Sequence, residues 1–271
     1  MEYKPALPDQ NDNVSHTRPV REFFLLMSGI VLFFTVVFWA AGLLVDWAVT
    51  YISPEMEARI FSGFRVPGVT IPRGDDPRQK ALQALVDRLE PCVGIGYPLT
   101  VHLVKSETAN ALALPGGRII VLEGLLDRVA SENGLSFVLA HELAHFKNRD
   151  HLRGMGRGIV ITALAALVAG PGSEFTQVFA PTVNLNMAQY SQDRESLADR
   201  AALETLACSY GHAGGAAEFF RAMSAEDPGD REFIGHYFDS HPQALARIRD
   251  LERRIETLGK GELTPLPRIF R

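Results

Sequence analysis

The sequence predicts an α+β fold that is mostly helical, with a small antiparallel sheet, preceded by one N-terminal transmembrane helix. Three observations support this prediction. Residues 23–45 form an apolar run without charge, residues 99–123 contain three short segments of β-like composition, and most later segments have helical periodicity. A formal net charge of -5 offers nucleic acid little to bind, so we expect no nucleic-acid partner.

The N-terminal segment predicts a membrane anchor. Residues 1–20 are polar and rich in Pro, Asp and Asn, which is typical of a disordered tail. The apolar run from Phe23 to Val45 would form a helix of about 34 Å, long enough for a hydrocarbon core of about 30 Å. A cleaved signal peptide is the alternative, but its apolar region is shorter, about 7 to 15 residues. We therefore expect a retained anchor over residues 21–50 that contacts lipid through Phe23 to Val45.

The orientation of this anchor depends on few charges. Lys4, Arg18 and Arg21 precede the apolar run, whereas Arg59 and Arg65 follow it at a greater distance. Because cytoplasmic flanks carry the excess of Lys and Arg, this distribution weakly favours a cytoplasmic N-terminus. The rest of the chain would then lie outside the cytoplasm.

Cysteine usage leaves one question open. Cys92 and Cys208 are far apart and form no CxxC motif, so neither a disulfide framework nor a thiolate zinc site follows. A single bridge between them would require an extracytoplasmic domain.

The segments after the anchor predict a connector, a helix and a hairpin. Residues 51–75 are rich in Pro and Gly and contain one short amphipathic turn from Glu55 to Phe61. Leucine spacing predicts a helix over 77–89. Strands are expected at 99–104, 110–115 and 118–123. Gly116 and Gly117 between the last two strands predict a hairpin turn.

The second half of the chain is predicted to be helical. Ser131 is suited to cap a helix that begins there. The apolar stretch from Ile159 to Gly170 is too short to span a membrane, so we expect either a buried helix or a segment that touches the membrane surface. Further helices are expected at 187–208, 213–224 and 242–258, followed by a tail over 259–271.

Residues 138–151 read VLAHELAHFKNRDH and contain a metal-site pattern. His141 and His145 are one turn apart and project from the same helix face, where they can share a tetrahedral ion. Glu142 points about 100° away from His141, so it is placed as a general base rather than as a third ligand. The alternative is a structural helix that contains the HExxH spacing by chance.

Two residues compete for the position of third ligand. His151 has the spacing of an HExxHxxGxxH site, but Asn148 occupies the glycine position and would need the left-handed conformation. Glu195 is the rival. It lies one turn before Asp199 on a predicted helix, an arrangement that suits a carboxylate ligand with a supporting acceptor. A solvated charged face is the alternative for this pair.

Four segments together resemble the family of membrane-associated zinc metallopeptidases that includes HtpX, the CAAX prenyl proteases and the OMA-type proteases. They are NALALPGGRIIV (110–121), VLAHELAHFKNRDH (138–151), the ExxAD from Glu195 to Asp199, and SHPQALARI (240–248). The resemblance covers about residues 75–258, and HExxH with a downstream ExxAD is a specific combination.

This resemblance implies a zincin-like metallopeptidase domain of the gluzincin type over residues 76–258, with one Zn2+ per chain. The implied metal ligands are His141, His145 and Glu195. Asp199 is implied as the partner of a ligand histidine, and His151 as a structural residue. The family more often has SR before the glutamate; here Arg194 directly precedes Glu195, so the resemblance does not extend to this arginine.

The resemblance also implies how substrate is held. An extended polypeptide would add to the edge strand through main-chain hydrogen bonds. The residues expected to line this cleft are Asn110, Ala111, Leu112, Ala113 and Leu114, although core packing explains their apolar character equally well. His241, which precedes Pro242, would either donate to the oxyanion or cap a loop. Arg247 would help to position this segment.

These roles predict peptide-bond hydrolysis, in which Glu142 takes a proton from the attacking water and passes it to the leaving amine. We expect a single-pass zinc endopeptidase of the bacterial inner membrane with a periplasmic catalytic domain, acting in protein quality control on unfolded or extended polypeptides. Prenyl-protein processing is disfavoured because one span cannot enclose a lipidated peptide. A non-catalytic adaptor or holdase with the same fold is the alternative, and a metzincin-type enzyme with His151 as ligand is a third interpretation.

Overall fold

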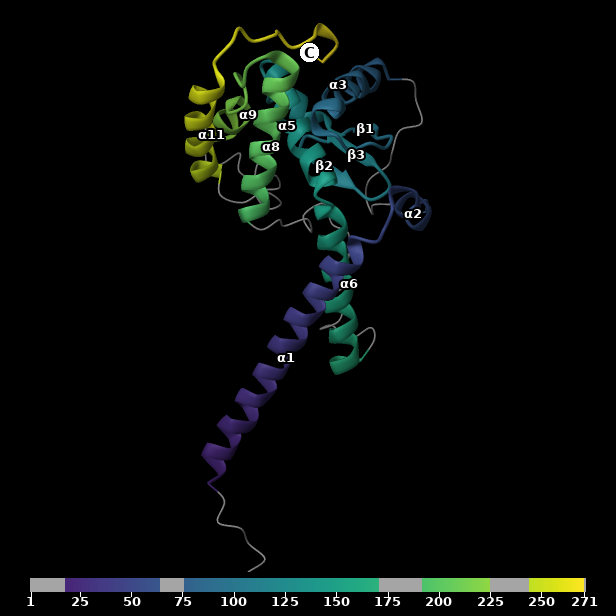
Figure 1. The fold of residues 1–271 in the computed structure, drawn as a ribbon, viewed down its shortest axis with the longest axis vertical. Coiled ribbons are helices and arrows are strands. Elements are labelled where there is room, and N and C mark those ends of the chain that lie inside the picture. Colours follow the sequence, from purple (N-terminus) through teal and green to yellow (C-terminus); the bar gives the residue numbers. More distant parts are fainter. Residues whose placement is uncertain (1–17, 64–75, 171–191, 225–243, 271) are drawn as a thin grey trace, which may run out of the picture. The chain divides into compact units, whose positions relative to one another are not determined.

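The computed structural model describes residues 18–63, 76–170, 192–224 and 244–270. The chain divides into two units, Met1–Leu44 and Val45–Arg271. Figure 1 shows the elements, which are α1 (Pro19–Val49), α2 (Pro54–Ile60), α3 (Pro77–Val93), β1 (Thr100–Val104), β2 (Ala111–Leu114), β3 (Arg118–Leu122), α4 (Glu123–Leu126), α5 (Glu132–Lys147), α6 (Asp150–Ala169), α8 (Gln192–Tyr210), α9 (Glu218–Ser224), α11 (Ala244–Leu258) and the 3-10 helix η2 (Arg268–Phe270). The described part is therefore mostly helical with one small sheet.

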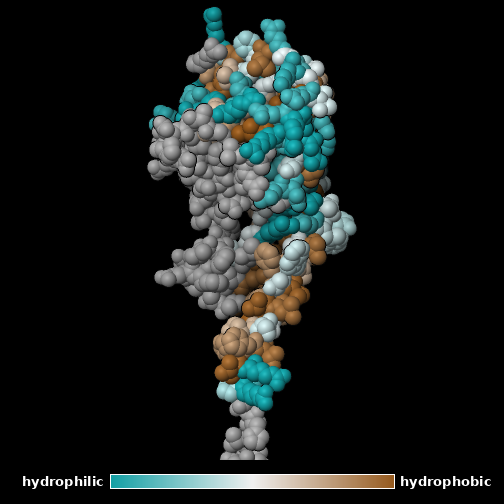
Figure 2. Space-filling model, turned by 90° about the vertical axis from the view of Figure 1, so that its left-hand side faces the viewer, coloured by the Kyte–Doolittle hydropathy of each residue, from teal (hydrophilic) through white to brown (hydrophobic). Residues whose placement is uncertain are grey.

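Helix α1 contains the apolar run. Among the described residues it is the one helix that is long and apolar enough to cross a membrane. Its large side chains are exposed, for example Phe24 at 64% and Trp39 at 68%. Figure 2 shows hydrophobic side chains gathered along this helix. An exposed apolar surface of this extent is typical of a helix that contacts a membrane or another protein.

Polar caps begin the next two helices. The side chain of Ser53 accepts the backbone N–H of Met56 at the start of α2, and Asp76 accepts that of Arg78 at the start of α3. Helix α3 continues four residues beyond the expected Leu89, through Pro91, and ends at Gly94 in the left-handed conformation (φ 73°). Pro91 lacks only its own backbone N–H donor and does not end this helix. Gly94 ends the helix because it adopts the left-handed conformation.

The sheet is mixed, so the prediction of an antiparallel sheet is wrong for one of its two pairings. Strands β2 and β3 form the expected antiparallel hairpin, with positive φ at both Gly116 (84°) and Gly117 (72°). Strand β1, however, pairs with β3 in parallel, and the strand order is β1-β3-β2. Strand β2 therefore lies two positions away from β1 in the sheet, and the hairpin brings β3 back between them. Sequence patterns of single strands carry no information on this order.

Helix α5 runs through the core of the second unit. In Figure 1 it lies between the sheet with α3 on one side and α8 on the other, and α5 contacts all of these elements. One face of the helix packs into the core, where Leu135, Leu139, Leu143 and Phe146 are at most 1% exposed. The opposite face is buried as well, because every residue from Glu132 to Phe146 lies below the surface.

The apolar stretch that begins at Ile159 is part of helix α6. In the structure this stretch is the second half of a helix that starts at Asp150. Ile159 is 53% and Leu167 is 83% exposed, so the interpretation as a buried helix is wrong for these two side chains.

The two cysteines form a disulfide between α3 and α8. The Cα atoms of Cys92 and Cys208 are 6.0 Å apart, and 116 residues separate them in the chain. The bridge therefore links the C-terminal half of α8 to the C-terminal end of α3. The sequence alone had left this pairing open.

Candidate metal centre

The two histidines of the HExxH pattern are presented by a well-capped, buried helix. Ser131 caps α5 as expected, since its side chain accepts the N–H of Gly134 at 3.0 Å. His141 and His145 are both 0% exposed. Nε2 of one ring is 3.1 Å from Nε2 of the other. The one-turn spacing therefore places the two ring nitrogens at a common point.

Glu195 of α8 completes this group. Its carboxylate oxygens lie 3.4 Å from Nε2 of His141 and 3.4 Å from Nε2 of His145. One ligand atom from each of the three residues falls within 4.8 Å of the others. Glu195 itself is 1% exposed, which excludes the interpretation of a solvated charged face.

His141 is supported by a buried aspartate and a buried arginine. Its Nδ1 lies 3.0 Å from Oδ1 of Asp199, at ion-pair distance. Arg247 of α11 donates to both oxygens of Asp199, at 2.8 and 2.7 Å, and its Nη1 lies 2.7 Å from Glu195. The guanidinium group also stacks over Phe220, 4.7 Å from the ring centroid. One arginine thus fixes both carboxylates of the predicted ExxAD pattern.

His145 has a second, separate support. Its Nδ1 lies 3.0 Å from Oδ2 of Asp150, the first residue of α6. The other oxygen of Asp150 lies 2.9 Å from Nη1 of Arg194. Both histidines therefore place Nδ1 beside a carboxylate and turn Nε2 toward the common point, which is the arrangement by which carboxylates orient imidazoles at metal sites.

The charges around the group shift the pKa values of its members. Burial opposes a positive charge on His141, but Glu195 and the hydrogen bond to Asp199 outweigh burial and raise the pKa of His141 to about 9. Burial would raise the pKa of Asp199, yet hydrogen bonds with Arg247 and His141 lower it to about 2. Burial opposes a positive charge on His145 too, but its contacts with Asp150 and Glu195 together outweigh burial and raise the pKa of His145. The centre is thus an anionic pocket that favours a cation.

The donor set fits a metal ion. Ligands held at about 2.0–2.1 Å by a tetrahedral zinc ion lie about 3.3 Å apart, close to the 3.1 and 3.4 Å observed here. The charged side chains around the donors are the carboxylates of Glu142, Asp150, Glu195 and Asp199 and the guanidinium groups of Arg194 and Arg247. Among the described residues, carboxylates therefore outnumber guanidinium groups at this site, which suits a cation.

Glu142 lies beside the metal group and contacts the sheet. It is 1% exposed, and its Oε2 accepts the backbone N–H of Ala113 in β2 at 3.0 Å. The C=O of Asn110 accepts from Leu122 of β3, so alternation in an antiparallel pair turns the main chain of Ala111 and Ala113 toward the outer edge of β2. The structure therefore brings the HExxH glutamate to the edge strand that was predicted to bind substrate.

The structure places His151 away from the metal group. Its Nε2 lies 3.0 Å from Oε1 of Glu57 in α2, and the same oxygen accepts the N–H of Gly116 at 2.7 Å. Asn148 is right-handed, and the left-handed residue at this junction is Arg149 (φ 56°), which turns the chain directly into α6. The turn needed for a third histidine ligand is absent at Asn148. His241 lies outside the described residues.

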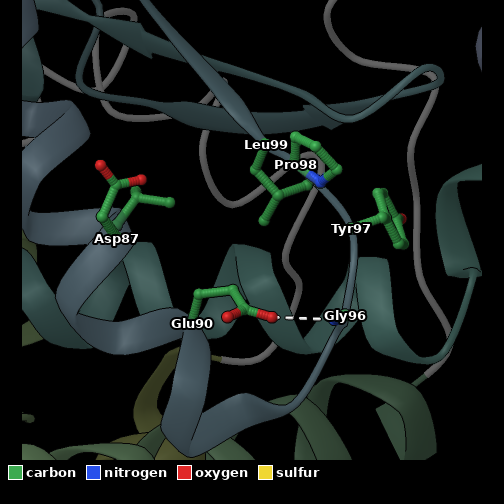
Figure 3. A pocket seen from close by; sticks show the side chains of 7 residues that line it. Asp87, Glu90, Gly96, Tyr97, Pro98 and Leu99 are labelled. Atoms are coloured by element: carbon green, nitrogen blue, oxygen red, sulfur yellow. Dashed lines mark hydrogen bonds between the residues drawn. The ribbon is translucent and has the colours of Figure 1, made fainter.

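A hollow elsewhere on the domain is lined by carboxylates but has a structural explanation. Figure 3 shows Asp87 and Glu90 of α3 facing the loop from Gly96 to Leu99. Glu90 accepts the N–H groups of Ile95 and Gly96, at 3.1 and 2.8 Å, and so holds the loop that follows its own helix. None of the metal-group residues lines this hollow.

Sequence reasoning missed part of the centre. Asp150 belongs to the quoted histidine segment and Arg194 precedes Glu195, yet neither residue received a role. The available signal was position: Asp150 stands at the start of the next helix, where a carboxylate is favoured by the helix dipole and lies close to the end of α5.

Two histidines and a glutamate buried around one point, with a further glutamate beside them on the HExxH helix, define the site of a metallopeptidase. The chain belongs to peptidase family M48, whose sequence profile matches residues 76–255, more than half of the chain. The predicted resemblance to a metallopeptidase family is thus confirmed.

Individual relatives carry names that agree with this class. The chain is 27% identical to the mitochondrial metalloendopeptidase OMA1 of Danio rerio over 197 residues, which are 66% of this chain and 41% of the relative. It is 25% identical to a protease HtpX homolog of Campylobacter concisus over 230 residues, 69% and 78% of the two chains. It is 24% identical to the metalloprotease LoiP of Escherichia coli over 172 residues, 60% and 66% of the two chains. The chain spans less than half the length of the OMA1 relatives it matches.

Proposed function

We propose that this protein is a membrane-anchored zinc endopeptidase with a zincin-like catalytic domain over residues 76–258, which cleaves extended polypeptides in quality control at a bacterial envelope. The observation that carries the proposal is the buried group of His141, His145 and Glu195 with Glu142 beside it. The three donors would hold one Zn2+, which two imidazoles and a carboxylate suit better than Ca2+ or Mg2+. When bound, zinc polarises the scissile carbonyl and lowers the pKa of the attacking water.

Glu142 is the general base of this proposal. It takes a proton from the attacking water and later delivers it to the leaving amine. Its bond to the N–H of Ala113 holds the carboxylate at the edge of β2, where a substrate main chain would lie. His241 would add a donor to the oxyanion.

Substrate would bind along β2. The residues proposed to contact it are Asn110, Ala111, Leu112, Ala113 and Leu114. The N–H groups of Ala111 and Ala113 already donate to the side chains of Asn110 and Glu142, so their outward C=O groups would accept from an extended chain. Pairing through the main chain selects little for side-chain identity. Such low selectivity suits an enzyme that handles unfolded or misassembled proteins. Asp199 and Arg247 would hold Glu195 in place while substrate binds and leaves.

The anchor and the disulfide support the proposed location. Helix α1 is long and apolar enough for one span, and the residues 21–50 would form it, with lipid contacts from Phe23 to Val45. Disulfides persist in oxidising compartments, so the bond between Cys92 and Cys208 supports a periplasmic catalytic domain at the inner membrane. This agrees with the weak charge bias for a cytoplasmic N-terminus. The N-terminal tail would comprise residues 1–20, the connector residues 51–75 and the C-terminal tail residues 259–271.

Metal content and cleavage, measured together, test the proposal. The full chain in detergent is compared with Glu142→Gln, Glu195→Ala and His151→Ala, using casein as an unfolded substrate. We expect Glu142→Gln to keep about one zinc per chain and lose cleavage, because glutamine preserves the contact to Ala113 but cannot take the proton. Glu195→Ala should lose both zinc and cleavage, whereas His151→Ala should keep zinc.

Other outcomes identify the competing interpretations. Zinc lost from His151→Ala but kept in Glu195→Ala would favour a metzincin-type site. Cleavage that survives in Glu142→Gln, or a wild-type chain without zinc, would contradict the protease mechanism and favour a chain-binding adaptor or holdase.

A further inference from the structure

Three arginines from two helices meet one aspartate at the start of the second unit. Asp46 belongs to the last turns of α1. Its Oδ2 lies 2.6 Å from Nη2 of Arg157, and its Oδ1 lies 3.6 Å from both Arg153 and Arg194. Arg153 and Arg157 come from α6, whereas Arg194 comes from α8. This cluster has no part in the mechanism proposed above.

One of these arginines leads directly to the metal centre. Nη2 of Arg194 faces Asp46, and its Nη1 contacts Oδ1 of Asp150 at 2.9 Å. Oδ2 of Asp150 lies 3.0 Å from Nδ1 of His145. A continuous series of charged contacts thus runs from Asp46 through Arg194 and Asp150 to a metal-ligand histidine.

We propose that Asp46 is a positioning residue for the metal centre: it holds Arg194 against Asp150 and thereby fixes the ring of His145. The inference depends on the proposed zinc site and adds a residue that lies outside the matched family segment of 76–255. It makes the last turns of the anchor helix part of the catalytic apparatus.

Charge balance gives the reason why Asp46 matters. Without its carboxylate, Arg153, Arg157 and Arg194 would lose the anion that they share, and Arg194 would keep only its contact with Asp150. Like charges at this spacing repel, and Arg194, at 20% side-chain exposure, can turn toward solvent. Asp150 would then lose its partner, and the imidazole of His145 would lose the support that sets its orientation. Partners of this kind contribute about 10- to 100-fold to metal affinity when they contact the ligand directly.

Close packing between the same elements provides an independent observation. A Cβ atom at Gly156 of α6 would lie 2.7 Å from Cγ1 of Val45, which is closer than side chains tolerate. Val45, Val49 and Leu152 form a small buried cluster at this contact. The start of α6, which carries Asp150, is therefore held against the end of α1 by packing as well as by charge.

Zinc affinity of the full chain in phospholipid nanodiscs tests the inference. Wild type, Asp46→Asn and the control Glu55→Gln are titrated with a zinc chelator, and kcat and KM for casein and the melting temperature of the zinc-loaded protein are measured. Glu55 is an exposed carboxylate on α2, so the control removes the same charge without touching the cluster. We expect Asp46→Asn to weaken zinc binding about threefold to tenfold, below the range for a direct partner, and to lower kcat with little change in KM.

A double variant separates this route from general damage. The effect of Asp46→Asn should disappear when Arg194→Gln is already present, because the proposed route passes through Arg194. An undiminished effect in that background, or wild-type zinc affinity in Asp46→Asn, overturns the inference. If Asp46→Asn does not fold, Arg194→Gln alone is measured, and wild-type zinc affinity there overturns it equally. A wild-type chain without zinc would instead contradict the proposed function.

Discussion

The two ligand histidines are supported in similar ways on opposite sides of the metal group. In each, Nδ1 lies 3.0 Å from an aspartate oxygen, and each aspartate is paired with an arginine. On the His141 side the arginine, Arg247, is 5% exposed, forms two bonds to Asp199 and also contacts Glu195. On the His145 side the arginine is 20% exposed and continues to Asp46. The first support is rigid and internal to the domain, whereas the second depends on the end of the anchor helix.

The largest effect should follow from removing the internal support. Arg247→Met leaves Asp199 and Glu195 buried without their common cation, and breaking a buried pair of this kind costs about 3–5 kcal/mol. We expect strong destabilisation and loss of zinc, measured by urea unfolding and by metal content of the purified chain. Arg249→Met is the control, since Arg249 is exposed on the same helix. Equal zinc content in both variants would show that the His141 side does not depend on its arginine.

Loss of the disulfide should lower stability without changing the metal group. The bond closes a separation of 116 residues, and a native disulfide contributes about 2–4 kcal/mol to stability. Cys208 is 13 residues from Glu195 along α8, which is about 20 Å of helix. We expect the double variant Cys92→Ser with Cys208→Ser to unfold at lower urea concentration while it keeps wild-type zinc affinity.

A reducing agent applied to the wild-type chain should likewise lower the urea concentration at which the chain unfolds. A weakened zinc site in the double serine variant would show instead that the bond positions Glu195, and the internal support would then extend to α3.

Asp150→Asn should have a moderate effect that is confined to the metal centre. Asparagine keeps an acceptor for His145 but loses the charge that pairs with Arg194. We expect zinc affinity to fall about tenfold, which corresponds to about 1.4 kcal/mol. Asp193→Asn is the matched control, because Asp193 is exposed and adjacent to Arg194. An effect as large as that of Arg247→Met would remove the proposed difference between the two supports.

The smallest effect tests the packing of α6 against the end of α1. Gly156→Ala must displace Val45, and overpacking of this kind costs about 1 kcal/mol or more. Gly154 and Gly158 on the same helix have nothing within 4 Å of an added Cβ. Alanine at either position should therefore stabilise the helix by up to about 1 kcal/mol. Urea unfolding of the three single variants measures the contrast, and three equal shifts would contradict the close contact.

The sequence predicted the parts of this molecule that depend on local pattern. Helix α5 and its cap at Ser131 follow from apolar periodicity and capping chemistry, and the HExxH spacing gave His141 and His145. For the third donor the spacing left Glu195 and His151 as rivals, and the family resemblance implied Glu195 with Asp199 as its neighbour. Each of these signals lies within a few turns of one helix, where the backbone geometry is known in advance.

The remaining features depend on contacts between distant segments. The parallel pairing of β1 with β3 places a later strand between two earlier ones. Asp46 and Arg194 meet although 148 positions separate their numbers, 194 minus 46. Long side chains at exposed or half-buried positions show no periodicity, so charge pairs of this kind carry no pattern that a single sequence reveals.

The metal donors come from two helices that leave the ribosome at different times. His141 and His145 are made first, Glu195 follows after α6 and the segment beyond it, and Arg247 is made later still, on α11. A chain that is synthesised from its N-terminus therefore carries both histidines before it has a complete ligand set. The proposed ligand set is therefore complete only once α8 has been made, and Arg247 can contact Glu195 only after α11 has followed.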